Sequence, residues 1–186
     1  MLNIIRTVID KYYNVFFYNI RPMICLLSKK YKQPLTGIEI GTYDGKNAKY
    51  MFKLLNLKKL YCIDPFKPYL VIRNTGESNV QRDDMPSIYD IAKKNLYRYK
   101  DKILFIKKYS DDAINDVPIV DFVYIDGDHR YEQVKKDIEN YYPKARLVIG
   151  GDNFPNHGVA LAVLDFVKKN NLELYTDNQD WWINKC

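Results

Sequence analysis

Between residues 35 and 184, short apolar runs alternate with longer helical patterns, and this alternation constrains the fold more than any other feature. Most of the runs are followed directly by glycine or aspartate. Continuous apolar runs of this kind are typical of strands buried on both faces. Strands that alternate with helices form a parallel sheet covered by helices on both sides. The predicted strands are Gly37–Ile40, Leu60–Ile63, Ile103–Ile106, Asp121–Ile125 and Arg146–Ile149.

The helical patterns and the end of the chain complete the predicted architecture. Near the end, Leu172–Thr176 and Trp181–Asn184 flank a short polar turn, which predicts an antiparallel hairpin. Residues 67–86 are polar and are expected to be irregular. The fold class is therefore α/β: a Rossmann-like, doubly wound, mostly parallel seven-stranded sheet with a C-terminal antiparallel hairpin. The predicted helices are Lys46–Leu57, Ser87–Tyr99, Tyr131–Tyr142 and Val159–Asn170.

Residues 1–34 follow a different pattern. Apolar pairs recur every four residues between Ile4 and Phe17, which predicts one face of a helix, and Pro22 would start a second short helix. We therefore expect a helical appendage, residues 1–34, and a domain, residues 35–186. The appendage would dock on the domain or form a homodimer contact. A membrane-surface helix or a cover over the substrate is the alternative.

The net charge of +6 is unevenly distributed along the chain. Residues 1–108 carry a net charge of +12, whereas residues 109–186 carry a net charge of −6. A basic half can bind nucleic acid or a membrane. Outside the appendage, however, most of its basic residues fall in 46–59 and 93–108, where solvated helix faces are the simpler interpretation. Nucleic acid is therefore not the expected partner, and the acidic half is expected to hold a site for a cation.

Cysteine usage and the longest uncharged runs indicate the compartment. Cys25, Cys62 and Cys186 match no metal-binding or disulfide spacing, which favours a reducing environment. Near the N-terminus the longest uncharged run, 12–20, is too short to span a membrane, and charges before it interrupt any signal-peptide core. A cytoplasmic protein without a transmembrane segment is expected.

Glycines and acidic residues follow the predicted strands, at the edge where open parallel sheets bind their ligands. The first strand continues into Gly41-Thr42-Tyr43-Asp44-Gly45, in which the two glycines allow a sharp turn and a close approach to a ligand. This loop matches neither the dinucleotide pattern nor the P-loop. Glu39, just before it, suits a cationic or hydroxyl-bearing ligand. Asp64, after the second strand, is placed to bind ribose hydroxyls.

Two further strand ends supply hard oxygen donors. Asp126 follows the fourth predicted strand, and Asp152 and Asn153 follow the fifth. Neighbouring parallel strands end at the same edge, so these side chains are expected to meet. Two carboxylates and an amide oxygen suit Mg²⁺ or another divalent cation. The alternative is that Asp152 and Asn153 only cap the next loop, while Asp126 contacts the cofactor.

Together these motifs resemble one family. Glu39-x-Gly41-x-Tyr43-x-Gly45, followed by Asp64 and Ser110, resembles the cofactor site of class I S-adenosylmethionine-dependent methyltransferases. Segments 120–132 and 150–166 resemble small-molecule O-methyltransferases of the catechol type and of the sugar- and antibiotic-tailoring type. The resemblance covers roughly residues 35–186 and leaves out 67–86.

The resemblance implies S-adenosylmethionine as the cofactor and gives each strand end a role. Glu39 would anchor the methionine part or the adjoining ribose, with Tyr43 and Asn47 flanking the methionine end. Asp64 would take the ribose hydroxyls, and Ser110 would border the adenine with its neighbour. The residues implied to bind the cofactor are Glu39, Gly41, Tyr43, Gly45, Asn47, Asp64, Ser110, Asp111 and Asp126.

The implied reaction is methyl transfer to a hydroxyl of a small acceptor, either a sugar or a catechol-like compound. A divalent cation at Asp126, Asp152 and Asn153 would lower the pKa of that hydroxyl and hold it in place. His129 is the best general base by side-chain pKa. Catechol-type enzymes have a lysine in this loop, so Asp126 or Asp128 is an alternative base. A non-catalytic binding module with this fold and an RNA hydroxyl methyltransferase are the alternative functions.

Overall fold

The computed structural model describes residues 21–67, 71–72, 78–79 and 87–185. The first helix predicted in the appendage lies outside these residues, as does most of the segment predicted to be irregular. In that segment, β3 (Val71–Ile72) and β4 (Ser78–Asn79) form a separate antiparallel pair. In the described part of the chain, no helix is long and apolar enough to cross a membrane.

One seven-stranded sheet forms the centre of the domain. Its strands are β1 (Leu35–Ile40), β2 (Leu57–Ile63), β5 (Ile103–Ile106), β6 (Val120–Ile125), β7 (Ala145–Gly151), β8 (Tyr175–Asp177) and β9 (Asp180–Asn184). They run in the order β5-β2-β1-β6-β7-β9-β8. The first five are parallel, whereas β9 is antiparallel to both β7 and β8. The predicted mostly parallel sheet with a C-terminal antiparallel hairpin is confirmed.

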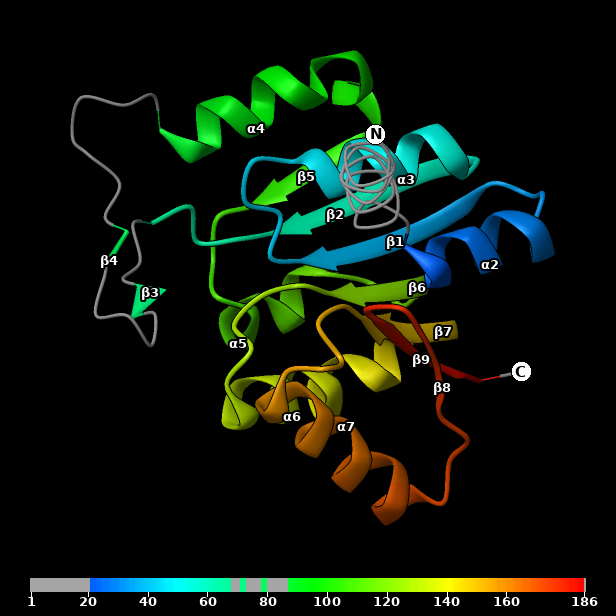
Figure 1. Ribbon diagram of the computed structural model, residues 1–186. Coiled ribbons are helices and arrows are strands. Elements are labelled where there is room, and N and C mark those ends of the chain that lie inside the picture. The colour runs from blue at the N-terminus through cyan, green and yellow to red at the C-terminus, as the bar shows by residue number, and fades with distance from the viewer. Residues whose placement is uncertain (1–20, 68–70, 73–77, 80–86, 186) are drawn as a thin grey trace, which may run out of the picture.

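Helices cover both faces of this sheet (Figure 1). The α-helices are α2 (Pro22–Lys30), α3 (Lys46–Leu54), α4 (Ile88–Leu96), α5 (Ser110–Ala113), α6 (Tyr131–Tyr141) and α7 (His157–Asn170). Three short 3₁₀ helices are η1 (Tyr97–Lys102), η2 (Ile114–Asp116) and η3 (Tyr142–Lys144). The helices α2, α3 and α4 pack on one face, and α5, α6 and α7 pack on the other.

Strand β6 shows why the sheet is buried on both sides. Phe122 and Tyr124 pack against the layer of α2, α3 and α4, whereas Val123 and Ile125 pack against the opposite layer. All four side chains are buried. Successive side chains of a strand point to opposite faces, so a strand between two helical layers has to be apolar throughout. The continuous apolar run therefore predicted this strand correctly.

Several predicted boundaries differ from the structure by a few residues, and two of these differences show a physical cause. The helix predicted at Lys46–Leu57 ends at Leu54, and Leu57 instead begins β2, where it is buried and pairs with Leu35 of β1. The hairpin turn is shorter than predicted and consists of two residues, of which Asn178 has a positive φ of 54°. Two-residue hairpin turns favour asparagine and glycine because these residues adopt the left-handed backbone conformation that the turn needs.

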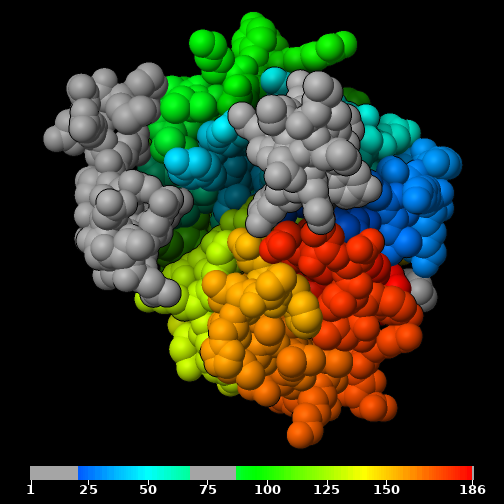
Figure 2. Space-filling model, in the orientation of Figure 1, coloured from blue at the N-terminus to red at the C-terminus, as the bar shows by residue number. Residues whose placement is uncertain are grey.

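Helix α2 is built into the core of the domain. It begins at Pro22, as predicted, and Met23, Ile24 and Leu27 have no exposed surface. Figure 2 shows the C-terminal residues, in red, lying against this blue segment. The Met23 amide donates a hydrogen bond of 3.0 Å to Asp180 at the start of β9. The predicted division between an appendage, residues 1–34, and a domain stays a prediction, because residues 1–20 lie outside the part of the chain that the structure describes.

Candidate functional site

The carboxyl ends of four neighbouring strands meet at one edge of the sheet. Ile40 at the end of β1 pairs with Ile63 of β2 and with Ile125 of β6, and Ile125 pairs with Gly151 of β7. Because these strands end in register, the loops that follow them lie side by side, as the sequence predicted. The acidic residues brought to this edge are Glu39, Asp64, Asp126 and Asp152.

Two glycines shape the loop after β1. Gly41 has a φ of +86°, and a Cβ placed there would lie 2.0 Å from the backbone oxygen of Asp126. Gly45 has a φ of +77° and packs against Leu96 of α4 so closely that a Cβ would lie 2.7 Å from its Cδ1. Both positions therefore require glycine. Tyr43, between them, also has a positive φ, of 47°.

Glu39 is a buried carboxyl group with one unused oxygen. Its side chain has no exposed surface, and Oε1 accepts a hydrogen bond of 3.0 Å from the side-chain amide of Asn47. Among the described residues, Oε2 of Glu39 and Oδ1 of Asn47 have no hydrogen-bond partner. Burial raises the pKa of Glu39 to about 8. Buried acceptors are normally paired, so these atoms fit a ligand that carries hydrogen-bond donors or positive charge.

Asp64 supports the loop after β1. Its Oδ2 accepts a hydrogen bond of 2.8 Å from the amide of Tyr43, and its Oδ1 accepts one of 2.6 Å from the amide of Phe66. Burial raises the pKa of Asp64 above its ordinary value. Each carboxylate oxygen has a second lone pair, so the predicted contact with ribose hydroxyls is compatible with these bonds. The supporting role was not predicted from the sequence.

The side chains of Ser110 and Asp111, at the start of α5, are turned toward α6. Ser110 donates a hydrogen bond of 2.6 Å to Asp137, and Gln133 donates one of 3.1 Å to Asp111. Burial raises the pKa of Asp137 to about 6. These contacts join α5 to α6. A contact of Ser110 and Asp111 with a cofactor stays a prediction.

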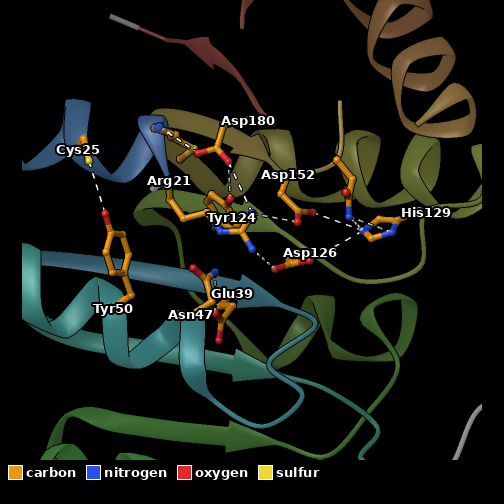
Figure 3. A network of polar contacts seen from close by, with 12 residues as sticks. Arg21, Cys25, Glu39, Asn47, Tyr50, Tyr124, Asp126, His129, Asp152 and Asp180 are labelled. Carbon is orange, nitrogen blue, oxygen red and sulfur yellow. Dashed lines mark hydrogen bonds and ion pairs between the residues drawn. The ribbon is translucent and has the colours of Figure 1, made fainter. Parts of the chain in front are cut away.

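Two carboxylates and an imidazole lie at the acidic end of this edge (Figure 3). His129 Nε2 lies 3.4 Å from Asp152 Oδ1 and 3.8 Å from Asp126 Oδ1. One ligand atom from each of the three lies within 4.8 Å of the others, as a shared metal ion would require. Asp126 and Asp152 were predicted to meet. His129 was predicted in the same loop as a base, and the structure adds it to the candidate ligands.

Asn153 lies next to this group but presents its nitrogen. Its Nδ2 is 3.3 Å from both ring nitrogens of His129, and its φ is +54°. A metal ligand would use the amide oxygen instead. Asn153 as a metal ligand therefore stays a prediction. Asp128, the alternative base, is exposed and pairs with Arg130, whose Nε lies 2.8 Å from it.

The carboxylates set the protonation of this group. The neighbouring carboxylates of Asp126 and Asp152 raise the pKa of His129 to about 9. Burial and the negative charge of Asp152 raise the pKa of Asp126. Burial would also raise the pKa of Asp152, but the close imidazole of His129 and the charge of Arg21 hold it below its ordinary value. Without a bound ligand, His129 is therefore positively charged at neutral pH.

Sequence reasoning missed Arg21. This residue precedes α2, yet its Nη1 lies 3.0 Å from Asp152 Oδ2 and its Nη2 lies 3.4 Å from Asp126 Oδ2. The signal was weak because Arg21 was one of six basic residues in the predicted appendage and had no pattern around it. Its contact with residues more than a hundred positions away follows from the packing of α2 on the sheet.

Comparisons with known proteins agree with the fold. A family model described as a methyltransferase domain matches residues 38–149. An uncharacterized protein of Acanthamoeba polyphaga mimivirus is 33% identical over 122 residues, which are 60% of this chain and 47% of that protein. The chain therefore spans about half the length of this curated relative.

Two solved structures illustrate the similarity of the fold. A precorrin-6y C5,15-methyltransferase from Geobacter metallireducens has a TM-score of 0.61 at 11% identity, with 87% of this chain and 84% of that chain covered. A protein described as a caffeoyl-CoA O-methyltransferase from Staphylococcus aureus has a TM-score of 0.62 at 15% identity, with 96% and 90% covered. At these identities the similarity concerns the fold.

Proposed function

The chain belongs to the family of methyltransferase domains, and from that premise we propose that it transfers a methyl group from S-adenosylmethionine to a small acceptor. The acceptor group is a hydroxyl of a sugar or of a catechol-like compound, and a divalent cation assists. The observation that carries the proposal is Glu39, a fully buried carboxyl group with an unpartnered Oε2 next to the loop of Gly41 and Gly45.

The cofactor half of the site fits S-adenosylmethionine by its chemistry. When bound, this cofactor supplies an electrophilic methyl group on a sulfonium sulfur. Glu39 accepts hydrogen bonds through its unpartnered oxygen, and Asn47 accepts through its own. Gly41 and Gly45 let the loop pack closely against the Asp126 backbone and Leu96, which fixes its path beside Glu39. Asp64 offers its second lone pairs to hydroxyls while it holds the loop in place.

The acceptor half is the acidic group at the ends of β6 and β7. Asp126 and Asp152 are the carboxylates that would hold a divalent cation, and the charge of such a cation would lower the pKa of a neighbouring hydroxyl. Transfer of a methyl group to the acceptor oxygen would release the proton of that hydroxyl. A cation held by the two carboxylates would offset the negative charge that keeps His129 protonated and so lower its pKa. The neutral imidazole would then take the proton, and Asp152, 3.4 Å away, would stabilise the resulting imidazolium.

Methylation of an RNA hydroxyl is the second candidate, and one observation favours it. Two exposed lysines near the carboxyl end of β5 lie over the same tyrosine ring. The Nζ atoms of Lys93 and Lys107 are 4.6 Å and 4.3 Å from the ring centre of Tyr89. Basic side chains interleaved with aromatic rings are typical of single-stranded nucleic-acid surfaces.

Binding and transfer are tested in sequence. Calorimetry with S-adenosylmethionine measures the first step, and the absence of heat with folded protein would contradict the cofactor assignment. Transfer of a labelled methyl group is then measured with sugars, catechols and short RNA, each with Mg²⁺ and with a chelator. We expect transfer to a sugar or catechol hydroxyl that falls on chelation. Transfer to RNA alone would favour the second candidate.

A matched pair of variants tests the acceptor half. Asp152→Asn removes one charge from the acidic group, whereas Asp101→Asn removes one from the exposed helix η1. We expect Asp152→Asn to lower methyl transfer by roughly a hundredfold or more while cofactor binding persists, because outer contacts and ligands of such sites have effects of this size. Asp101→Asn should behave as the wild type. Equal activity of the two variants would remove Asp152 from the reaction.

A further inference from the structure

Arg21 shares both carboxylates of the proposed cation site with His129. The Oδ2 atoms of Asp126 and Asp152 face Arg21, at 3.4 Å and 3.0 Å. The Oδ1 atoms of the same residues face His129, at 3.8 Å and 3.4 Å. Figure 3 shows the two carboxylates between these cationic side chains. A cation bound on the His129 side would therefore share its two carboxylates with Arg21, which already contacts the other oxygen of each.

The guanidinium is held in this position from behind. Its Nη1 lies 3.9 Å from Oδ1 of Asp180, a carboxyl group with no exposed surface, and its Cζ lies 5.9 Å from the ring centre of Tyr124. Asp180 is itself fixed, because Tyr124 donates it a hydrogen bond of 2.8 Å and the Met23 amide donates one of 3.0 Å. Arg21 is thus part of a connected buried network and not a surface side chain in passing contact.

The backbone of Arg21 is fixed as well. Its carbonyl oxygen accepts a hydrogen bond of 3.0 Å from the Cys25 amide in the first turn of α2. That helix is anchored by Met23, Ile24 and Leu27, which have no exposed surface. The packing of α2 on the sheet therefore holds the guanidinium against Asp126 and Asp152. Its side chain is 20% exposed, so solvent screens its charge only in part.

A site binds a hard divalent cation more tightly when the net negative charge of its ligands and their neighbours is larger. Two carboxylates alone offer a charge of −2, and the positive charge of Arg21, which also faces Asp180, offsets part of it. From this we infer that Arg21 is a built-in counter-cation that keeps the divalent cation at Asp126 and Asp152 weakly held and exchangeable. This inference rests on the proposed function, because it concerns the cation site of that reaction.

The test measures cation binding directly, without cofactor, acceptor or turnover. Mn²⁺ serves as the probe, because the electron paramagnetic resonance signal of the free ion disappears on binding. Arg21→Gln is compared with Lys29→Gln, which removes the same charge from an exposed position of the adjoining helix α2. We expect Arg21→Gln to bind Mn²⁺ at least about tenfold more tightly than Lys29→Gln and the wild type. Arg21→Lys, which keeps the charge, should remain close to the wild type.

The outcomes separate this inference from the proposed function. Equal Mn²⁺ affinity of Arg21→Gln and Lys29→Gln would overturn the inference and leave the reaction untouched. Tighter binding by Arg21→Gln that is lost on adding Asp152→Asn supports it, even if no acceptor is ever methylated. Absence of Mn²⁺ binding in every variant would overturn the inference and remove the cation from the reaction. Should Arg21→Gln not fold, a Mg²⁺ titration of the wild type must shift the side-chain NMR signal of Arg21, and an unchanged signal overturns the inference.

Discussion

Asn47 donates a hydrogen bond of 3.0 Å to one oxygen of Glu39, while the second oxygen of this carboxyl group has no partner among the described residues. The Glu39 side chain has no exposed surface, so water cannot stabilise its charge. Burial therefore raises the pKa of Glu39 to about 8. Most Glu39 side chains are thus protonated at neutral pH before a ligand binds. A ligand that brings positive charge or donors has to displace that proton.

Cofactor affinity should therefore rise with pH. If S-adenosylmethionine binds the ionised form of Glu39, its affinity increases about tenfold per pH unit up to about pH 8 and then levels off. Calorimetry at several pH values measures this slope. Glu39→Gln, which cannot ionise, should bind more weakly and lose the slope. The same slope in Glu39→Gln would show that another group titrates.

Removing the Asp64 carboxylate should loosen the first loop. Asp64→Ala deprives the amides of Tyr43 and Phe66 of their acceptor, and hydrogen bonds to a charged group contribute about 1.5–3 kcal/mol. We expect cofactor binding to weaken by at least about tenfold, measured by calorimetry. Asp101→Ala, at an exposed position, serves as the control. Unchanged affinity in Asp64→Ala would show that the loop keeps its shape without this support.

His129→Gln should separate transfer from binding. Glutamine keeps a polar side chain near Asp152 but cannot act as a base at neutral pH. We expect kcat/KM for methyl transfer to fall by about a hundredfold or more, because positioned general bases contribute at least this much. The affinity for S-adenosylmethionine should stay unchanged, since Glu39 and Asp64 are intact. A loss of affinity without a loss of kcat would instead place His129 in the cofactor half.

Asp137 should make the domain less stable at higher pH. Burial raises its pKa to about 6, so the folded state holds a proton that the unfolded chain releases from about pH 4 upward. Stability from this group is complete below about pH 4, falls up to about pH 6 and then stays constant. Asp137→Asn keeps an oxygen that can accept from Ser110 but cannot ionise.

The difference in the free energy of unfolding between Asp137→Asn and the wild type shows whether the buried carboxylate stabilises or destabilises the domain. At about pH 7.5, Asp137→Asn should be more stable by a free energy of unfolding on the order of 2 kcal/mol, and the difference should vanish near pH 4. Thermal unfolding at both pH values measures it. A variant less stable by the same amount at both pH values would show that the carboxylate itself is needed to join α5 to α6.

The strand ends could be predicted because they depend on local patterns. A run such as 122–125 is apolar throughout since it lies between two helical layers, and Asp126 then marks its end. Placing several such ends at one edge requires only that parallel strands stop together. The same reasoning brought Asp126 and Asp152 together correctly. It also placed Glu39 just before the loop after β1 but gave no hint of its unpartnered oxygen.

Arg21 and Asp180 could not be predicted from such patterns. Their contact depends on how α2 packs against β9, and the two residues are separated by most of the chain. The orientation of Ser110 toward Asp137 is similar, because α5 is a single short turn and its direction is set by α6. Side-chain direction at a strand end is decided by neighbouring elements, which a linear pattern does not identify.

The close contact between Gly41 and the backbone of Asp126 has a consequence for how this site can change. The Asp126 amide donates a hydrogen bond of 2.8 Å to the carbonyl oxygen of Ile40, so the two halves of the site follow neighbouring, hydrogen-bonded strands. Neighbouring strands lie about 4.8 Å apart whatever their side chains. In the proposed reaction, this main-chain spacing would set the distance between the cofactor half and the acceptor half of the site. Substitutions in the loops that follow the strands would change the acceptor pocket without changing that distance.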